Sequence, residues 1–177
     1  MPAPLIIALS GSLLMAACAS GQVSPDTAEL RNMWRANLVP KSNPASMVRA
    51  FERFCVQAPQ DRSASEQKLR NAGYVPLPQE VAGVKAYVVD DRRPAVAVSD
   101  TMCLVQAESR TGQTTRFQNF VAETYPEAQP VDPAPLGDNI EQAWSVPSDP
   151  PQLIATERTE SFGWYRYALI LFQPGAP

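Results

Sequence analysis

Residues 164–172 read Trp-Tyr-Arg-Tyr-Ala-Leu-Ile-Leu-Phe, and this stretch decides the fold class. Its second half is apolar at every position, whereas a strand with one face in water alternates apolar and polar residues. An unbroken apolar run of this kind is typical of a central strand that is covered on both faces. We therefore expect a sheet with residues 163–172 inside it, and residues 153–159 as their hairpin partner around Glu160 and Ser161.

The remaining strands are predicted from shorter runs with a period of two residues. Three of them lie in the middle of the chain, over residues 84–89, 95–98 and 102–107. Residues 126–151 contain seven prolines, which exclude a long helix or a continuous central strand. We expect this segment to cross the surface, with one short strand over residues 140–146. The sequence thus predicts a mostly antiparallel sheet of five to six strands.

Helices are expected where apolar residues recur every three to four positions. Four segments combine this spacing with a capping residue at the start and Pro or Gly at the end: residues 25–38, 43–58, 63–72 and 114–125. Ser63 and Glu66 have the spacing of a capping box, and Gly73 supplies the stop after it. Helices and strands fall in separate blocks, so the fold class is α+β with helices packed on the sheet. We expect a single domain over residues 43–177, preceded by an amphipathic helix and linker over residues 25–42.

The first 17 residues carry no charged side chain, and their apolar segment is shorter than the about 20 residues that a membrane-spanning helix needs. They have the composition of a secretory signal peptide. Met15-Ala16-Ala17-Cys18 resembles the lipobox of bacterial lipoproteins, in which the cysteine becomes the lipidated first residue. This resemblance implies cleavage before Cys18 and a lipidated tether over residues 18–24. It also implies export and a membrane anchor facing the periplasm, with the outer membrane preferred over the inner.

Two other outcomes remain open for this N-terminus. Ala17, Cys18 and Ala19 also form an A-x-A site, at which ordinary cleavage would discard Cys18 and release the protein into the periplasm. In the third outcome the segment stays uncleaved as an anchor. Each outcome exports the domain.

Export bears on the two remaining cysteines, Cys55 and Cys103. In an oxidising compartment this even pair predicts a structural disulfide that closes a loop of 47 intervening residues. The alternative is a buried free thiol together with a reactive one.

Three segments around these cysteines also resemble small exported proteins of proteobacteria: Phe51–Cys55, Leu69–Tyr74 and Met102–Val105. The shared features are a cysteine in a helix, a Leu-x-x-Ala-Gly-aromatic turn and a Cys-x-Val strand. The resemblance implies no activity and transfers no catalytic residue to this chain.

Composition excludes several classes of site. The 177 residues contain no His, so Ser-His triads, imidazole bases and His-ligated metals are impossible. The net charge of −3 does not suit a nucleic-acid binder, and the eight glycines form no phosphate-binding loop. No acidic segment matches a calcium-binding loop either. We expect no cofactor, no metal and no nucleic-acid partner.

Charge is unevenly distributed along the chain. Residues 30–70 contain eight Lys and Arg against three Asp and Glu, whereas residues 71–177 contain seven against thirteen. Because the basic segment begins shortly after Cys18, the helix that carries Arg31, Trp34 and Arg35 could lie on an anionic membrane. In the alternative interpretation its apolar face packs on the domain and its arginines are solvated.

One charged connection is a candidate for partner contact. Asp90, Asp91, Arg92 and Arg93 join two predicted strands, and exposed loop tips with arginine are typical of interfaces. The alternative is a turn that carries solvated charge. The two aspartates could also be proposed as a carboxylate pair for glycoside hydrolysis, but turns favour Asp for local hydrogen bonds.

Two further groups of residues allow both a functional and a structural interpretation. Glu157 and Glu160 could form a carboxylate pair, although nothing in their spacing requires them to face each other. Trp164, Tyr165 and Tyr167 could stack on a sugar, but strand alternation separates Trp164 from the tyrosines, so at least one set should lie in the core.

The function expected from these patterns is that of an envelope lipoprotein acting as a non-catalytic binding or accessory subunit. Two alternatives come from other classes. One is a soluble periplasmic inhibitor that inserts a loop such as residues 90–94 into an enzyme. The other is a carboxylate-based cell-wall hydrolase that works without His.

Overall fold

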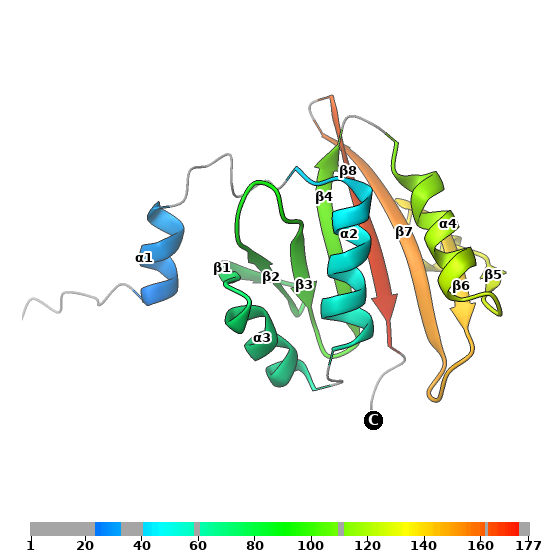
Figure 1. Ribbon diagram of the computed structural model, residues 1–177, viewed down its shortest axis with the longest axis horizontal. Coiled ribbons are helices and arrows are strands. Elements are labelled where there is room, and N and C mark those ends of the chain that lie inside the picture. Colours follow the sequence, from blue (N-terminus) through cyan, green and yellow to red (C-terminus); the bar gives the residue numbers. More distant parts are fainter. Residues whose placement is uncertain (1–23, 33–40, 59–60, 110–111, 162, 174–177) are drawn as a thin grey trace, which may run out of the picture.

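The computed structural model describes residues 24–32, 41–58, 61–109, 112–161 and 163–173 (Figure 1). In these residues the chain forms an eight-stranded antiparallel sheet with the order β1-β2-β3-β4-β8-β7-β6-β5. The strands are β1 (Val75–Val81), β2 (Val84–Val88), β3 (Ala95–Val98), β4 (Met102–Ser109), β5 (Gln129–Val131), β6 (Ile140–Val146), β7 (Gln152–Ser161) and β8 (Trp164–Phe172). The helices are α1 (Pro25–Asn32), α2 (Pro44–Phe51), the π-helix η2 (Glu52–Val56), α3 (Arg62–Asn71), α4 (Thr114–Thr124) and the 3-10 helix η3 (Ala134–Leu136). The predicted α+β class is confirmed.

The predicted number of strands, five to six, is wrong, because the patterns give no sign of β1 and β5. Both strands contain proline: Pro76 and Pro78 in β1, and Pro130 in β5. Proline cannot donate a ladder hydrogen bond, so within sheets it is confined to edge strands, bulges and strand starts. β1 and β5 are the two edges of this sheet, and β1 also contains a register shift between Pro76 and Glu80.

Strand β8 lies in the middle of the sheet, as residues 164–172 predict. It pairs with β4 on one side and with β7 on the other. Side chains on both of its faces are buried, each no more than 3 % exposed: Tyr167, Ala168, Leu169, Ile170 and Leu171. The central position therefore explains why this strand shows no polar alternation.

The order of elements contains a topological repeat. Helices α2 and α3 lead into the meander β1–β4, and helix α4 leads into the meander β5–β8. The two meanders join through their last strands, β4 and β8, which pair antiparallel. This pairing relates the two halves of the sheet by an approximate two-fold axis.

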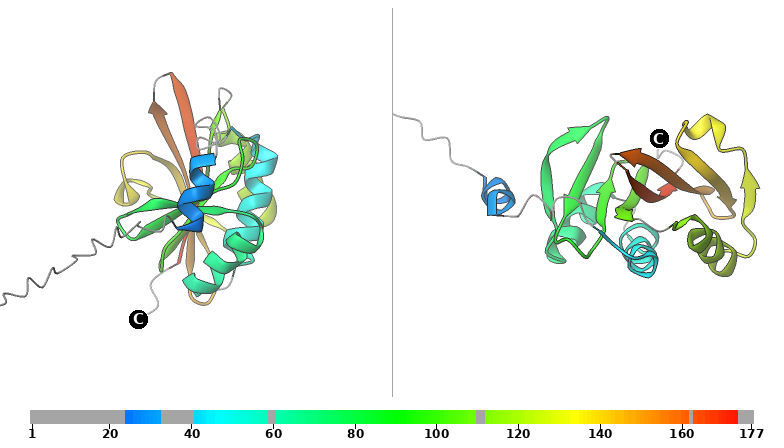
Figure 2. Two further views of the ribbon diagram at one scale, coloured as in Figure 1. Left: turned by 90° about the vertical axis from the view of Figure 1, so that its left-hand side faces the viewer. Right: turned by 90° about the horizontal axis from the view of Figure 1, so that it is seen from above.

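Helices α2, α3 and α4 cover one face of the sheet, here called the helix face (Figure 2). Asn43 caps α2 by accepting a hydrogen bond from the backbone N–H of Ser46 (2.9 Å), and Pro44 occupies the first turn, as the sequence predicts. Met47 and Phe51 of α2 are fully buried, and the ring of Phe51 meets Phe120 of α4 edge to face at 6.0 Å. The main core of the domain lies between these helices and the sheet.

Helix α3 begins at Arg62, one residue earlier than predicted, and its cap lies two residues before the predicted one. The Asp61 carboxylate accepts a hydrogen bond from Ala64 N (2.7 Å), so the predicted Ser63 cap is wrong. Glu66 does not close a capping box but pairs with Arg62 (2.8 Å). The predicted stop is confirmed, since Gly73 has a φ of 84°, which disfavours any residue with a Cβ.

Helix α1 lies beside the edge strand β1. Its Asp26 carboxylate pairs with Arg70 of α3 at 3.0 Å. Arg31 is exposed, whereas Trp34 and Arg35 lie outside the described residues. Among the described residues, no helix combines the length and the apolar character needed to cross a membrane.

The predicted disulfide between Cys55 and Cys103 is confirmed, and it joins η2 to β4. Both cysteines are buried in the main core, where Phe54, Val105 and Leu171 also lie. The cross-link spans 48 positions in the sequence. In the chain-entropy model, a loop of this length stabilises the fold by about 3–4 kcal/mol.

We therefore expect Cys55→Ser and Cys103→Ser each to lower the free energy of unfolding by about 3–4 kcal/mol, measured by urea denaturation without reductant. The double variant should be no less stable than either single variant, because all three lose the same cross-link. Wild-type protein in reductant serves as the control and should match the double variant. If the double variant lost the sum of the two single-variant losses in free energy of unfolding, the two cysteines would not share one disulfide.

Candidate functional site

A cavity of about 640 Å³ opens on the helix face, between α2–η2 on one side and the turns before β1 and β3 on the other. Its size lies in the range of small-ligand sites. Three arginines, two aromatic rings and a few small or polar residues line it: Ser46, Arg49, Ala50, Glu52, Arg53, Phe54, Gln57, Ala72, Tyr74, Arg93 and Pro94. We call it the arginine cavity.

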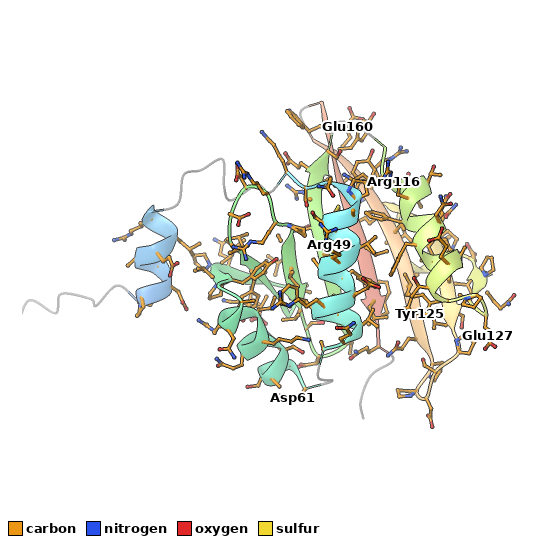
Figure 3. All side chains as sticks on the ribbon, viewed as in Figure 1. Arg49, Asp61, Arg116, Tyr125, Glu127 and Glu160 are labelled. Atoms are coloured by element: carbon orange, nitrogen blue, oxygen red, sulfur yellow. A yellow bond between two sulfur atoms is a disulfide. The ribbon has the colours of Figure 1, made fainter. Side chains whose placement is uncertain are left out.

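One wall of the arginine cavity is a single face of α2–η2. Ser46, Arg49 and Arg53 recur at three- and four-residue steps, so their side chains project to the same side. Arg49 Nη2 donates a hydrogen bond to Ser46 Oγ (3.1 Å), which orients the guanidinium. Figure 3 shows Arg49 on α2, on the helix face of the molecule.

The helix widens into the π-helix η2 where it meets the cavity floor. In this turn Phe54 and Cys55 are both buried, while Arg53 stays exposed. Lys68 Nζ of α3 donates to the carbonyl oxygens of Arg53 (2.6 Å) and Gln57 (2.9 Å), which satisfies carbonyls that the end of a helix leaves open. Short π-helical turns of this kind occur frequently at functional sites.

The floor is formed by Phe54 and Tyr74, whose rings meet at 5.2 Å. Tyr74 donates its hydroxyl hydrogen bond to the Pro94 carbonyl (3.1 Å), and burial raises the pKa of Tyr74 to about 12. Its ring is therefore neutral at physiological pH. The guanidinium of Arg53 lies 5.0 Å from the centre of the Phe54 ring, and that of Arg93 lies 5.9 Å from the centre of the Tyr74 ring. Both distances suit cation–π contacts.

The opposite wall includes Arg93, the last residue of the connection Asp90–Arg93. Asp90 Oδ1 accepts hydrogen bonds from the backbone N–H groups of Arg92 (2.9 Å) and Arg93 (2.7 Å), and Asp90 Oδ2 accepts one from Arg93 Nε (2.7 Å). Arg93 Nη1 also donates to the Ala72 carbonyl at the end of α3 (3.4 Å). Burial alone would raise the pKa of Asp90, but the hydrogen bonds from Arg93 and Arg92 outweigh it and hold that pKa below its usual value.

Of the four residues predicted for partner contact, two belong to the arginine cavity and two do not. Arg93 lines the cavity, and Asp90 orients it. Asp91 and Arg92 are exposed and do not line it. Sequence reasoning missed Arg49, Arg53 and Tyr74. The four-residue spacing of Arg49 and Arg53 was a visible signal, whereas their proximity to Arg93 depends on how α2 and β3 pack.

Electrostatically, the arginine cavity suits an anion. Three guanidinium groups line it, and Glu52 is the one carboxylate among its described lining residues. The arginines keep free donor directions, because guanidinium carries five N–H bonds and the contacts above use only some of them. Among the described residues, no group of three His, Cys, Asp or Glu side chains is placed to hold a metal ion.

The carboxylate and aromatic side chains singled out near the C-terminus lie outside the arginine cavity. Glu157 and Glu160 are three positions apart on β7, so their side chains point to opposite faces of the sheet. Burial raises the pKa of Glu157, against the opposing charge of Arg166. Tyr167 is buried in the main core and Tyr165 packs against it, whereas Trp164 is on the other face, with Lys41 Nζ 4.9 Å from its ring centre.

Comparisons with known proteins give no relative from which a function could be transferred. No family model matches the chain, and neither the curated proteins nor the solved structures contain a match to it.

Because the pKa of Asp90 is lowered in the folded protein, its ionised form stabilises the fold above the unfolded-state pKa, and this stabilisation is lost as the pH falls through the folded-state pKa. We expect Asp90→Asn to lower the free energy of unfolding at pH 7 by no more than about 1 kcal/mol, since the pair with Arg93 is partly exposed. The difference from wild type should shrink as the pH falls below about 4.

Urea denaturation at a series of pH values measures this effect. Asp91→Asn is the matched control, because Asp91 is the neighbouring residue and its side chain is exposed. It should change stability by less than about 0.5 kcal/mol at pH 7. An Asp90→Asn deficit that persists unchanged at pH 3 would contradict the role assigned to this carboxylate.

Proposed function

We propose that the chain is an envelope lipoprotein anchored at Cys18, and that its domain is a non-catalytic binding subunit. In this proposal the arginine cavity holds an anionic group of the partner. The observation that carries the proposal is the convergence of Arg49, Arg53 and Arg93 over an apolar aromatic floor.

The chemistry of the cavity favours an anion over other ligands. Guanidinium matches carboxylate and phosphate oxygens with two parallel hydrogen bonds, and such charge-assisted bonds are about twice as strong as neutral ones. The partly apolar lining lowers the local dielectric constant, which strengthens the attraction to a bound charge. Phe54 and Tyr74 add flat apolar surface that a ligand can contact.

The cavity is also largely organised before binding. Ser46 holds Arg49, while Asp90 and the Ala72 carbonyl hold Arg93. A long side chain that is already ordered loses less conformational entropy when a ligand arrives. The contacts of Arg93 also hold the connection Asp90–Arg93 against the end of α3. This position favours a wall of a binding site, because an inhibitor loop would protrude from the domain.

Two features support a location in the envelope. The disulfide between Cys55 and Cys103 belongs in an oxidising compartment. The resemblance of residues 15–18 to a lipobox supplies the anchor. A tethered domain with a rigid anion-binding cavity corresponds to an accessory subunit that is held close to its partner.

A fluorescent hexaglutamate peptide is a direct probe of the cavity, with binding to the full-length protein followed by fluorescence anisotropy. We expect Arg53→Gln and Arg93→Gln each to weaken binding by about tenfold, as expected for loss of a charge-assisted hydrogen bond. Affinity for the wild-type protein should also fall as salt is added.

Arg116→Gln is the matched control, because Arg116 is exposed and lies on the same helix face but outside the arginine cavity (Figure 3). It should bind the peptide like wild type. Equal weakening by all three variants would show a diffuse charge effect, and unchanged binding by the Arg53 and Arg93 variants would refute the cavity as the site.

The anchor is tested separately by Cys18→Ser. We expect this variant to move from the membrane fraction to the soluble periplasmic fraction, because a serine cannot take the thioether-linked lipid. Intact mass of the wild-type protein from its own envelope should give a chain that begins at Cys18 with acyl groups added. A variant that stays membrane-bound, or a wild-type mass that begins at Ser20, would overturn the lipoprotein assignment.

A further inference from the structure

The face of the sheet opposite the helices, here called the far face, carries a continuous apolar row. The strand register joins one residue from each strand between β2 and β5: Ala86, Ala97, Leu104, Ile170, Ala155, Ala143 and Val131. No member of the row is polar. A face of this composition is built to be covered rather than to meet water.

The chain itself covers the second half of this row. The segment between β5 and β6, residues 132–139, lies on the side of the sheet away from α2 and α4 (Figure 2). Leu136 of η3 packs there together with Val131 and Ile140. The floor beneath it is closed, with Ala143, Ala155, Ala168 and Ile170 each no more than 3 % exposed.

The first half has a different connection at the same place in the repeat. β1 and β2, the first two strands of their meander, are joined by the two-residue turn Ala82-Gly83, in which both residues have positive φ. Where the second half has its own cover, a cavity of about 580 Å³ is open here. We call it the far-face cavity; its lining is mostly apolar, with Val81 at 70 % exposure.

One charged side chain lies at the far-face cavity. Arg166 of β8 is the single basic residue among the described residues that line it, beside Ala97 and Leu104. Its guanidinium is 3.7 Å from the Glu108 carboxylate, which is a loose ion pair, and its side chain is 46 % exposed. Its charge also opposes the burial-driven rise in the pKa of Glu157, so this carboxylate is a second acidic neighbour. Because guanidinium carries five N–H donors and this one is exposed, Arg166 can take a further acidic group at the edge of an apolar surface.

We propose that the far-face cavity binds a polypeptide segment of a partner protein, which inserts an aliphatic side chain as Leu136 does in the other half. An acidic residue next to that side chain pairs with Arg166. We expect a peptide because, in the covered half, a segment of polypeptide packs Leu136 on the same face of the sheet. We expect it to be acidic because Arg166 lies beside the apolar floor of the cavity.

The segment lies on the face of the sheet and does not add a strand at its edge. Pro76 and Pro78 remove two donors from β1, and α1 lies beside that strand. Strand addition depends on main-chain hydrogen bonds along an open edge. Recognition therefore rests on the aliphatic insertion and on the charge of Arg166.

Selection of displayed random 12-residue peptides on the immobilised full-length protein tests the proposal. We expect enriched peptides in which Leu, Ile or Val is adjacent to, or within a few residues of, Asp or Glu. Binding of a synthesised enriched peptide should weaken about tenfold in Ala97→Trp, which fills the cavity from its floor, and several-fold in Arg166→Gln.

Val81→Asp keeps the test decisive if Ala97→Trp fails to fold, because this exposed position tolerates a polar residue and the new charge repels an acidic peptide. Val56→Asp is the matched control: Val56 is also an exposed valine, 40 % exposed, on η2 and away from the far-face cavity. It should bind the peptide like wild type.

Three results would overturn the proposal. The first is a selection without enrichment, and the second is an enriched peptide that binds Val81→Asp as it binds wild type. The third is the absence of a bound peptide together with binding of laurate that Val81→Asp abolishes, which would make the occupant an anionic amphiphile. Hexaglutamate binding at the arginine cavity should be unchanged in Val81→Asp, so failure here is distinguishable from failure of the proposed function.

Discussion

The antiparallel pairing of β4 with β8 is the interaction on which the rest of the structure depends. It joins the two meanders through a continuous register from Met102–Phe172 to Ser109–Tyr165. Since side chains alternate between faces, a slip of one residue would exchange the two faces of a strand. Such a slip in β4 would turn Cys103 away from Cys55 and place Leu104 in the helix-face core. The disulfide, the main core and the far face therefore all require the same register.

Much of this architecture follows from local pattern. The central strand, the disulfide and the start of α2 were predicted because an apolar run, an even cysteine pair and an Asn-Pro cap each act within a few residues or have one sensible partner. The edge strands β1 and β5 escaped prediction because their prolines oppose strand structure everywhere except at an edge. Whether a strand lies at an edge is decided by the whole sheet and cannot be seen in seven residues.

The arginine cavity likewise combines features that local sequence predicts with features that only the whole fold determines. The sequence alone shows that Arg49 and Arg53 have helical spacing and that the Asp90–Arg93 connection is charged. Their meeting depends on how α2 and β3 pack in the folded domain. Arg53 lies in the π-helical turn η2, which adds a residue to one turn of the helix and buries Phe54 and Cys55 together. No periodicity of apolar residues signals that turn. It is stabilised from outside, by the bond to Cys103 and by Lys68 on the carbonyls of η2.

The two proposed surfaces lie on opposite faces of one sheet, and the same strands connect them. Val105 faces the main core while Leu104 and Gln106 face the far-face cavity, so β4 contributes to both layers. Close-packed layers change shape little on binding unless a second arrangement of similar energy exists. The cross-link between η2 and β4 makes relative movement of helix and sheet costly. Occupancy of one surface should then leave affinity at the other unchanged, which is the property of a subunit that bridges two partners rather than one that switches between them.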